Sequence, residues 1–168
     1  MERQEQLIDQ LFPKEVFDRL VGLVKRNYHK FEYNEFFGRY GATTEVWKPL
    51  MPYFVKSVPL AREIFGSETL IPSYALAVHY MGDQAKLVNH KDDNACTYTL
   101  DLSLYYQDSW DLVIEDRKYD LKPNQALAFY GEDQEHWRSD FPNPETNYYG
   151  AVFFHYVEPD HWFFTGDK

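Results

Sequence analysis

The spacing of hydrophobic residues divides the chain into a helical first part and a strand-rich second part. After Pro13, apolar residues recur every three to four positions, at Val16, Phe17, Leu20, Val21 and Val24. This spacing predicts an amphipathic helix with one face packed on a larger core. A second helix is predicted over 59–65, because proline suits the first turn of a helix and Gly66 suits its end.

From Ser73 onward, short runs rich in aromatic and aliphatic residues alternate with turn-forming clusters such as Asp92-Asp93-Asn94. The runs cover 74–80, 87–90, 98–105, 110–115, 125–130 and 148–157. Helices followed by many closely spaced strands predict an α+β fold, in which a β-sandwich or barrel is backed by N-terminal helices.

The length of 168 residues is enough for one domain with its own core, so we expect a single domain over 1–168. In it, helices over about 1–70 support a β-core over about 73–157, and 158–168 form a C-terminal tail. Aromatic residues make up 18% of the chain, a load that excludes disorder. The single cysteine, Cys96, excludes a disulfide framework and a thiolate zinc site.

The net charge is −10, with 17 Lys and Arg against 27 Asp and Glu. Such a surface repels polyanions, so nucleic acid is not expected as a partner. The N-terminus lacks the apolar run of a signal peptide, and no segment is apolar enough to span a bilayer. We therefore expect a cytoplasmic protein without a membrane partner.

A metal-ligand pattern stands out among the six histidines. His90 and Asp92 are two residues apart, so in an extended chain their side chains project to the same face. His136 follows Asp92 by 44 residues. Two imidazoles and one carboxylate form the facial triad that suits non-haem Fe(II). By themselves, the three residues also fit a surface turn and a satisfied core histidine.

The residues around this triple extend the pattern. Tyr80-Met81-Gly82-Asp83 precedes His90, and the run 121–129 (LKPNQALAF) precedes His136. The aromatic run 149–156 (YGAVFFHY) follows it. Over residues 73–157 this succession resembles the Fe(II)/2-oxoglutarate-dependent dioxygenases, in particular their prolyl-hydroxylase-like branch.

The resemblance implies a double-stranded β-helix (a jelly-roll, cupin-like core) with His90, Asp92 and His136 as iron ligands. It also implies Fe(II), 2-oxoglutarate as co-substrate and O₂. The implied reaction is hydroxylation of an unactivated C–H bond in an amino-acid, peptidyl or small biosynthetic substrate.

The sequence departs from the family pattern at the cation for the far carboxylate of 2-oxoglutarate. The family normally places an Arg or Lys about ten residues after the distal histidine, where this chain has Tyr148. Arg138 is the expected substitute, since it lies two residues beyond His136 on the same strand face. Tyr80 and Tyr148 are expected to add hydrogen bonds to the co-substrate.

Three alternatives stay open at this point. Arg138 also fits a rim ion pair with Asp140 or Glu135. The missing downstream cation also fits a non-haem iron oxygenase or oxidase that does not use 2-oxoglutarate. A non-catalytic β-sandwich binding module would leave the histidines and the carboxylate incidental. The substrate and the oligomeric state are not determined by the sequence.

Overall fold

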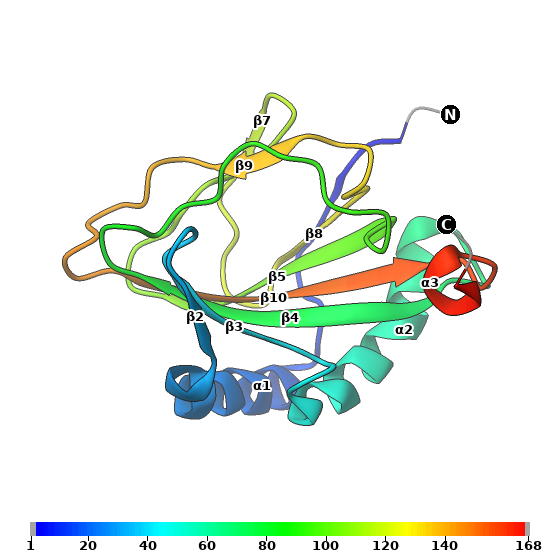
Figure 1. Cartoon of the computed structure of the whole chain (residues 1–168), viewed down its shortest axis with the longest axis horizontal. Coiled ribbons are helices and arrows are strands. Elements are labelled where there is room, and N and C mark those ends of the chain that lie inside the picture. Colours follow the sequence, from blue (N-terminus) through cyan, green and yellow to red (C-terminus); the bar gives the residue numbers. More distant parts are fainter. Residues whose placement is uncertain (1–2, 167–168) are drawn as a thin grey trace.

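Two antiparallel sheets and two long helices make up the protein (Figure 1). The structure is a computed structural model that describes residues 3–166. The helices are α1 (Lys14–Asn27), α2 (Met51–Phe65) and α3 (Trp162–Thr165), with short 3₁₀ turns η1 (Tyr28–Lys30) and η2 (Lys48–Leu50). The strands are β1 (Gln6–Ile8), β2 (Glu32–Asn34), β3 (Arg39–Thr43), β4 (Ile71–Met81), β5 (Tyr98–Tyr106), β6 (Leu112–Ile114), β7 (Arg117–Tyr119), β8 (Ala126–Phe129), β9 (His136–Arg138) and β10 (Tyr148–Val157).

The sheet order confirms the expected double-stranded β-helix. The larger sheet has the order β1-β8-β5-β10-β4-β3-β2, and the smaller has the order β7-β6-β9. A single bridge between His90 and His136 adds the chain before Asp92 to the edge of β9. In Figure 1 the helices α1 and α2 lie on one side of the larger sheet, and β7 and β9 lie on the other. The space between the two sheets is therefore the interior of the jelly roll.

Side-chain alternation along the central strand β10 separates two cores. Val152, Phe154 and Tyr156 pack with the helices, against residues such as Leu20 and Phe54. Residues at the odd-numbered positions of β10 point to the opposite side, into the space between the sheets. The helices thus support the large sheet from behind and leave its other face available for a site.

The first helix is confirmed by α1, but the second differs from the sequence prediction. α2 begins at Met51, so Pro52 occupies its first turn and Pro59 lies inside the helix. Proline at that position removes one backbone hydrogen bond. Phe54, Ser57 and Ala61 are buried against the sheet, and this packing keeps the helix continuous past Pro59. Tertiary packing outweighs the local break.

Two other expectations about secondary structure need correction. The first 70 residues contribute the strands β1, β2 and β3 as well as helices. β1 pairs with β8 at one edge of the large sheet, and β3 pairs with β4 and then with β2 at the other edge. The run 87–90 is not a regular strand, and only His90 pairs with a neighbour. Among the described residues, no helix is long and apolar enough to cross a membrane.

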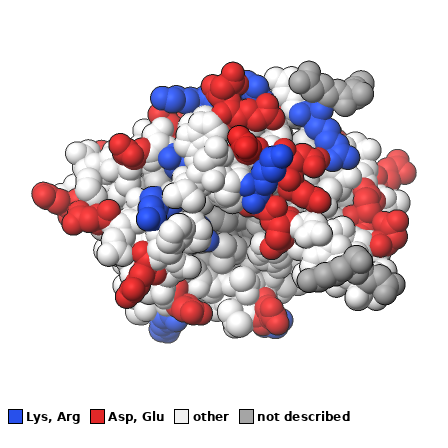
Figure 2. Space-filling view, turned by 45° about the horizontal axis from the view of Figure 1, so that its top comes forward, with Lys and Arg blue, Asp and Glu red and all other residues white. Residues whose placement is uncertain are grey.

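The charged side chains are spread over the surface. Figure 2 shows Asp and Glu over much of one face, with Lys and Arg between them in separate small groups. No continuous basic strip crosses this face, in keeping with the net charge of −10. The absence of a nucleic-acid partner stays a prediction.

Candidate metal centre

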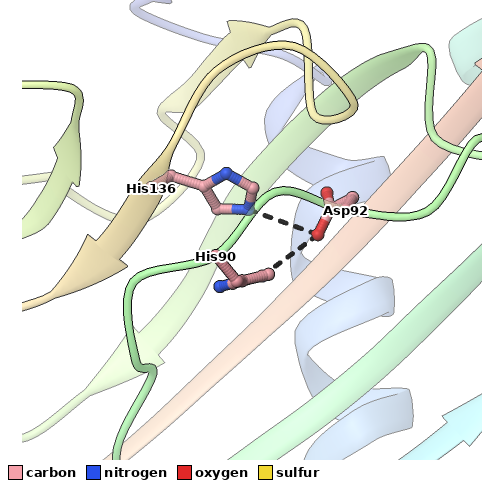
Figure 3. A group of neighbouring side chains, drawn as sticks. All are labelled: His90, Asp92 and His136. Atoms are coloured by element: carbon pink, nitrogen blue, oxygen red, sulfur yellow. Dashed lines mark hydrogen bonds and ion pairs between the residues drawn. The ribbon is translucent and has the colours of Figure 1, made fainter.

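His90, Asp92 and His136 meet at one point between the two sheets (Figure 3). The Nε2 atoms of His90 and His136 lie 3.1 Å and 3.3 Å from Asp92 Oδ1. Ligand atoms at right angles around one ion, each roughly 2.1 Å from it, lie about 3 Å apart. The two distances to Asp92 Oδ1 therefore match those between adjacent ligands around one ion, and all three ligand atoms lie within 4.8 Å of one another.

The protonation of both imidazoles favours a metal. His90 Nδ1 donates to the carbonyl of Val88 at 2.7 Å, and His136 Nδ1 donates to the carbonyl of Gln134 at 2.9 Å. Because a carbonyl only accepts, each Nδ1 carries a hydrogen, so that each ring in its neutral form presents a lone pair at Nε2. Two nitrogen lone pairs and a carboxylate oxygen then face one another, an arrangement that a cation stabilises. The donor set fits Fe(II).

Backbone hydrogen bonds fix the spacing of the three ligands. The amide of His90 donates to the carbonyl of His136, and the amide of His136 donates back to His90. The amide of Asp92 donates to the carbonyl of Gly131. A Cβ at Gly131 would lie 2.5 Å from Asp92 Oδ2 and 2.8 Å from Thr99 Oγ1. Only glycine lets the carboxylate lie this close to the turn.

Gln134 holds the turn that leads into β9, a role that could not be predicted from the sequence. Its side-chain carbonyl accepts from the amide of Tyr130, and its amide group donates to the carboxylates of Glu5 and Glu115. Its backbone carbonyl orients His136. The sequence signal was weak, since a glutamine two residues before a histidine has many other roles.

The electrostatics of the group reflect its mixed charge. Burial by itself raises the pKa of Asp92, but hydrogen bonding with His136 and His90 lowers it well below the ordinary value. Burial by itself lowers the pKa of His90, but Asp92 and the Val88 carbonyl raise it overall. Asp92 is therefore ionised at neutral pH and available as a ligand.

A cavity of about 110 Å³ adjoins the three ligands. Apolar side chains form much of its wall, including Leu87, Phe129 and Phe153. Polar groups form the rest of the wall, and Arg39, Asp101 and His155 are among them. A small space with both apolar walls and polar groups suits a small polar ligand bound at the metal.

Arg138 points inward as expected, but it already has an acidic partner. Its Nη2 lies 3.3 Å from Asp101 Oδ2, and its Nη1 donates to the carbonyl of Trp110 at 2.8 Å. Its guanidinium also lies over the rings of Trp110 and Tyr149. The rim pairing with Asp140 or Glu135 is not formed. A carboxylate ligand at Arg138 would have to compete with Asp101 for the same charge.

The two tyrosines expected near the co-substrate lie on opposite faces of the large sheet. Tyr80 is fully buried between the sheets, and its hydroxyl accepts from Arg39 at 2.6 Å. Tyr148 lines a separate pocket with Tyr28, His79 and other residues on the helix side. Tyr149, the next residue on β10, points into the space between the sheets and packs with Tyr80. Tyr148 is therefore not placed to meet a ligand at the metal group, which corrects the sequence-based expectation.

A second cluster, formed by Asp92, Cys96 and His155, also has ligand atoms within 4.8 Å of one another. Burial raises the pKa of the Cys96 thiol, and the sulfur is hydrogen-bonded with the Tyr74 hydroxyl at 3.2 Å. A thiol held in its neutral form is a poor metal ligand. We therefore treat this cluster as packing beside Asp92.

No protein-family model and no curated protein sequence matches the chain. Solved structures do match it in fold. A prolyl-4-hydroxylase from Pseudomonas putida matches with TM-score 0.68 and 11% identity over 93% of both chains. EctD from S. alaskensis, whose structure contains 2-oxoglutarate and 5-hydroxyectoine, matches with TM-score 0.70 and 10% identity, over 96% of this chain and 79% of that one.

The non-haem α-ketoglutarate-dependent epimerase SnoN from nogalamycin biosynthesis matches with TM-score 0.77 and 8% identity, over 93% of this chain and 79% of that one. At these identities the likeness concerns the fold. The double-stranded β-helix that the resemblance implied is thus confirmed as the fold. The chain has the double-stranded β-helix fold of the 2-oxoglutarate-Fe(II) oxygenases, with a His-Asp-His group that could hold the metal.

Proposed function

We propose that the protein is a non-haem Fe(II), 2-oxoglutarate-dependent oxygenase. The observation that carries the proposal is the convergence of two Nε2 atoms and one carboxylate oxygen, with both Nδ1 atoms hydrogen-bonded to backbone carbonyls. Three protein ligands on one face of the ion leave three positions free for small molecules. The fold likeness to 2-oxoglutarate-Fe(II) oxygenases supports the same conclusion.

His90, Asp92 and His136 would hold the iron. Bound there, Fe(II) and 2-oxoglutarate together supply the activation of O₂, with oxidative decarboxylation of the 2-oxo acid to succinate. The protein fixes the ligand geometry through the backbone pairing of His90 with His136. The apolar wall formed by Leu87, Phe129 and Phe153 limits the access of water to this space.

The reaction we infer is hydroxylation of a C–H bond in an amino-acid, peptidyl or small biosynthetic substrate. The names of the fold neighbours include prolyl hydroxylases, an epimerase and a carbocyclase, which support an oxidative reaction at carbon but differ in its outcome. The cavity of about 110 Å³ has room for one small group beside the metal ligands. A side chain or a small molecule suits this volume.

The test is succinate formation from 2-oxoglutarate with Fe(II) and O₂, over a panel of free amino acids, peptides and small metabolites. Replacement of His90 or Asp92 by alanine is expected to abolish both turnover and stoichiometric Fe(II) binding. The matched control is His29→Ala, because His29 is exposed and far from the group along the chain. Metal binding that is unchanged in both site variants would contradict the proposal and favour a non-catalytic binding module.

A second candidate is an iron oxygenase that does not use 2-oxoglutarate. The observation that favours it is the ion pair between Arg138 and Asp101, which leaves no free cation at the expected substitute position. Oxygen consumption that needs Fe(II) but produces no succinate would support this candidate over the first.

A further inference from the structure

Arg39 is a second arginine near the metal group. It begins β3 and lies opposite Tyr80 in the register between β3 and β4. Its guanidinium lies 4.3 Å from the centre of the Phe37 ring, and its Nη1 donates to the Tyr80 hydroxyl at 2.6 Å. These contacts fix the direction of the side chain, which lines the same cavity as His90, Asp92 and His136.

The charge of Arg39 has no acidic partner within the described part of the chain. The ion pairs of residues 3–166 involve other cations, and Arg138 in particular is paired with Asp101. The side chain of Arg39 is also partly withdrawn from water. A guanidinium in this state binds a carboxylate well, because its planar donors match the two carboxylate oxygens.

The other cations near the metal group are less suitable. Arg138 has a fully buried side chain and is not among the residues that line the metal cavity. Lys86 lies over the ring of Phe36 and lines a separate outer groove. Among the described lysines and arginines, Arg39 is the one that lines the cavity beside the ligands.

We propose that Arg39, rather than Arg138, binds a carboxylate group of a ligand at the metal centre. The carboxylate has two sources, the far end of the 2-oxo diacid or an acidic group of the substrate. The first source rests on the proposed function. In that case Arg39 takes the role expected of a cation after the distal histidine, but from β3, which is separated from β10 by β4 in the larger sheet.

The test compares 2-oxoglutarate with 2-oxopentanoate, which has the same chain but a methyl group in place of the far carboxylate. Calorimetric titration of the Mn(II)-loaded protein measures binding without turnover. We expect 2-oxoglutarate to bind about tenfold or more tightly than 2-oxopentanoate in the unchanged protein. Arg39→Met should remove this preference while 2-oxopentanoate still binds, which also shows that the variant is folded. Arg39→Lys should keep part of it.

Two comparison variants sharpen the result. Arg19→Met, on an exposed part of α1, should keep the full preference. Arg138→Gln should keep it as well, since it removes the charge of the rival cation, which does not line the metal cavity, and leaves Asp101 in place. Loss of the preference in Arg138→Gln but not in Arg39→Met would overturn the proposal.

A second arm tests the substrate as the source. Pentanoate is titrated by NMR into protein saturated with Mn(II) and 2-oxoglutarate. Binding of pentanoate that Arg39→Met abolishes, with the preference between the two 2-oxo acids unchanged, supports the substrate as the source. If the unchanged protein binds neither 2-oxo acid, the proposed function fails, and titration of pentanoate into the protein loaded with Mn(II) alone still tests Arg39. An Arg39→Met variant that alters neither measurement refutes the assignment.

Discussion

The ion pair between Asp101 and Arg138 allows a quantitative test of how the interior of the jelly roll is stabilised. Both side chains are almost fully buried, at 3% and 0% exposure. Arg138→Met leaves the Asp101 carboxylate without its cation and also removes the hydrogen bond to the Trp110 carbonyl. Removing one partner of a buried pair costs about 3–5 kcal/mol, because the remaining charge stays desolvated. We expect a loss of this size in the free energy of unfolding.

The double variant separates charge from packing. Replacing Asp101 by leucine together with Arg138 by methionine removes both charges, and such replacements are often neutral or stabilising. Urea unfolding at pH 7 should therefore give the double variant a stability close to that of the unchanged protein. The single variant should lie several kcal/mol below both.

The pH dependence of the single variant gives an independent check. Burial already raises the pKa of Asp101, and Arg138 counteracts this effect. Without Arg138 the pKa rises further, so the folded state holds a proton that the unfolded state releases above pH about 3.9. The stability of Arg138→Met should therefore fall as the pH rises from 4 toward the folded pKa. A flat profile, or a loss below about 1 kcal/mol, would refute the reasoning.

Three other variants test the surroundings of the site and the fold. Gly131→Ala should weaken Mn(II) binding about tenfold, since the new methyl group displaces Asp92, and unchanged affinity would argue against this contact. Glu5→Gln should cost about 2 kcal/mol at pH 7. Burial raises the pKa of Glu5, but Arg117 and other donors lower it to about 2, so the difference should vanish as the pH falls from 4.5 toward 2. Burial lowers the pKa of His79 to about 4, so stability falls as the pH drops from 6.5 to 4, and His79→Phe should reduce this slope in thermal unfolding scans.

Local patterns in the sequence predicted much of the fold. The apolar spacing after Pro13 corresponds to α1, and the turn-forming clusters separate the strands from β4 onward. These predictions succeeded because the period of hydrophobic residues depends only on neighbours within one helix or strand. The extent of α2 did not follow from local rules, since its burial against the sheet overrides the break expected at Pro59.

The metal group was predictable for a similar reason. His90 and Asp92 are two positions apart, and residues at this spacing in an extended segment project to the same face. His136 was assigned through the order of motifs along the chain, and the structure brings its Nε2 to 3.3 Å from Asp92 Oδ1.

The sequence by itself thus determined the fold class and the candidate ligands, whereas the tertiary structure decided the charges around them. The partner of Arg138 is 37 residues away on β5, and Arg39 reaches the cavity from the first quarter of the chain. Which face Tyr148 occupies depends on the register of β10, in which a shift of one residue exchanges the two sides. Contacts of this kind depend on how strands distant in sequence align, and no local pattern encodes that alignment.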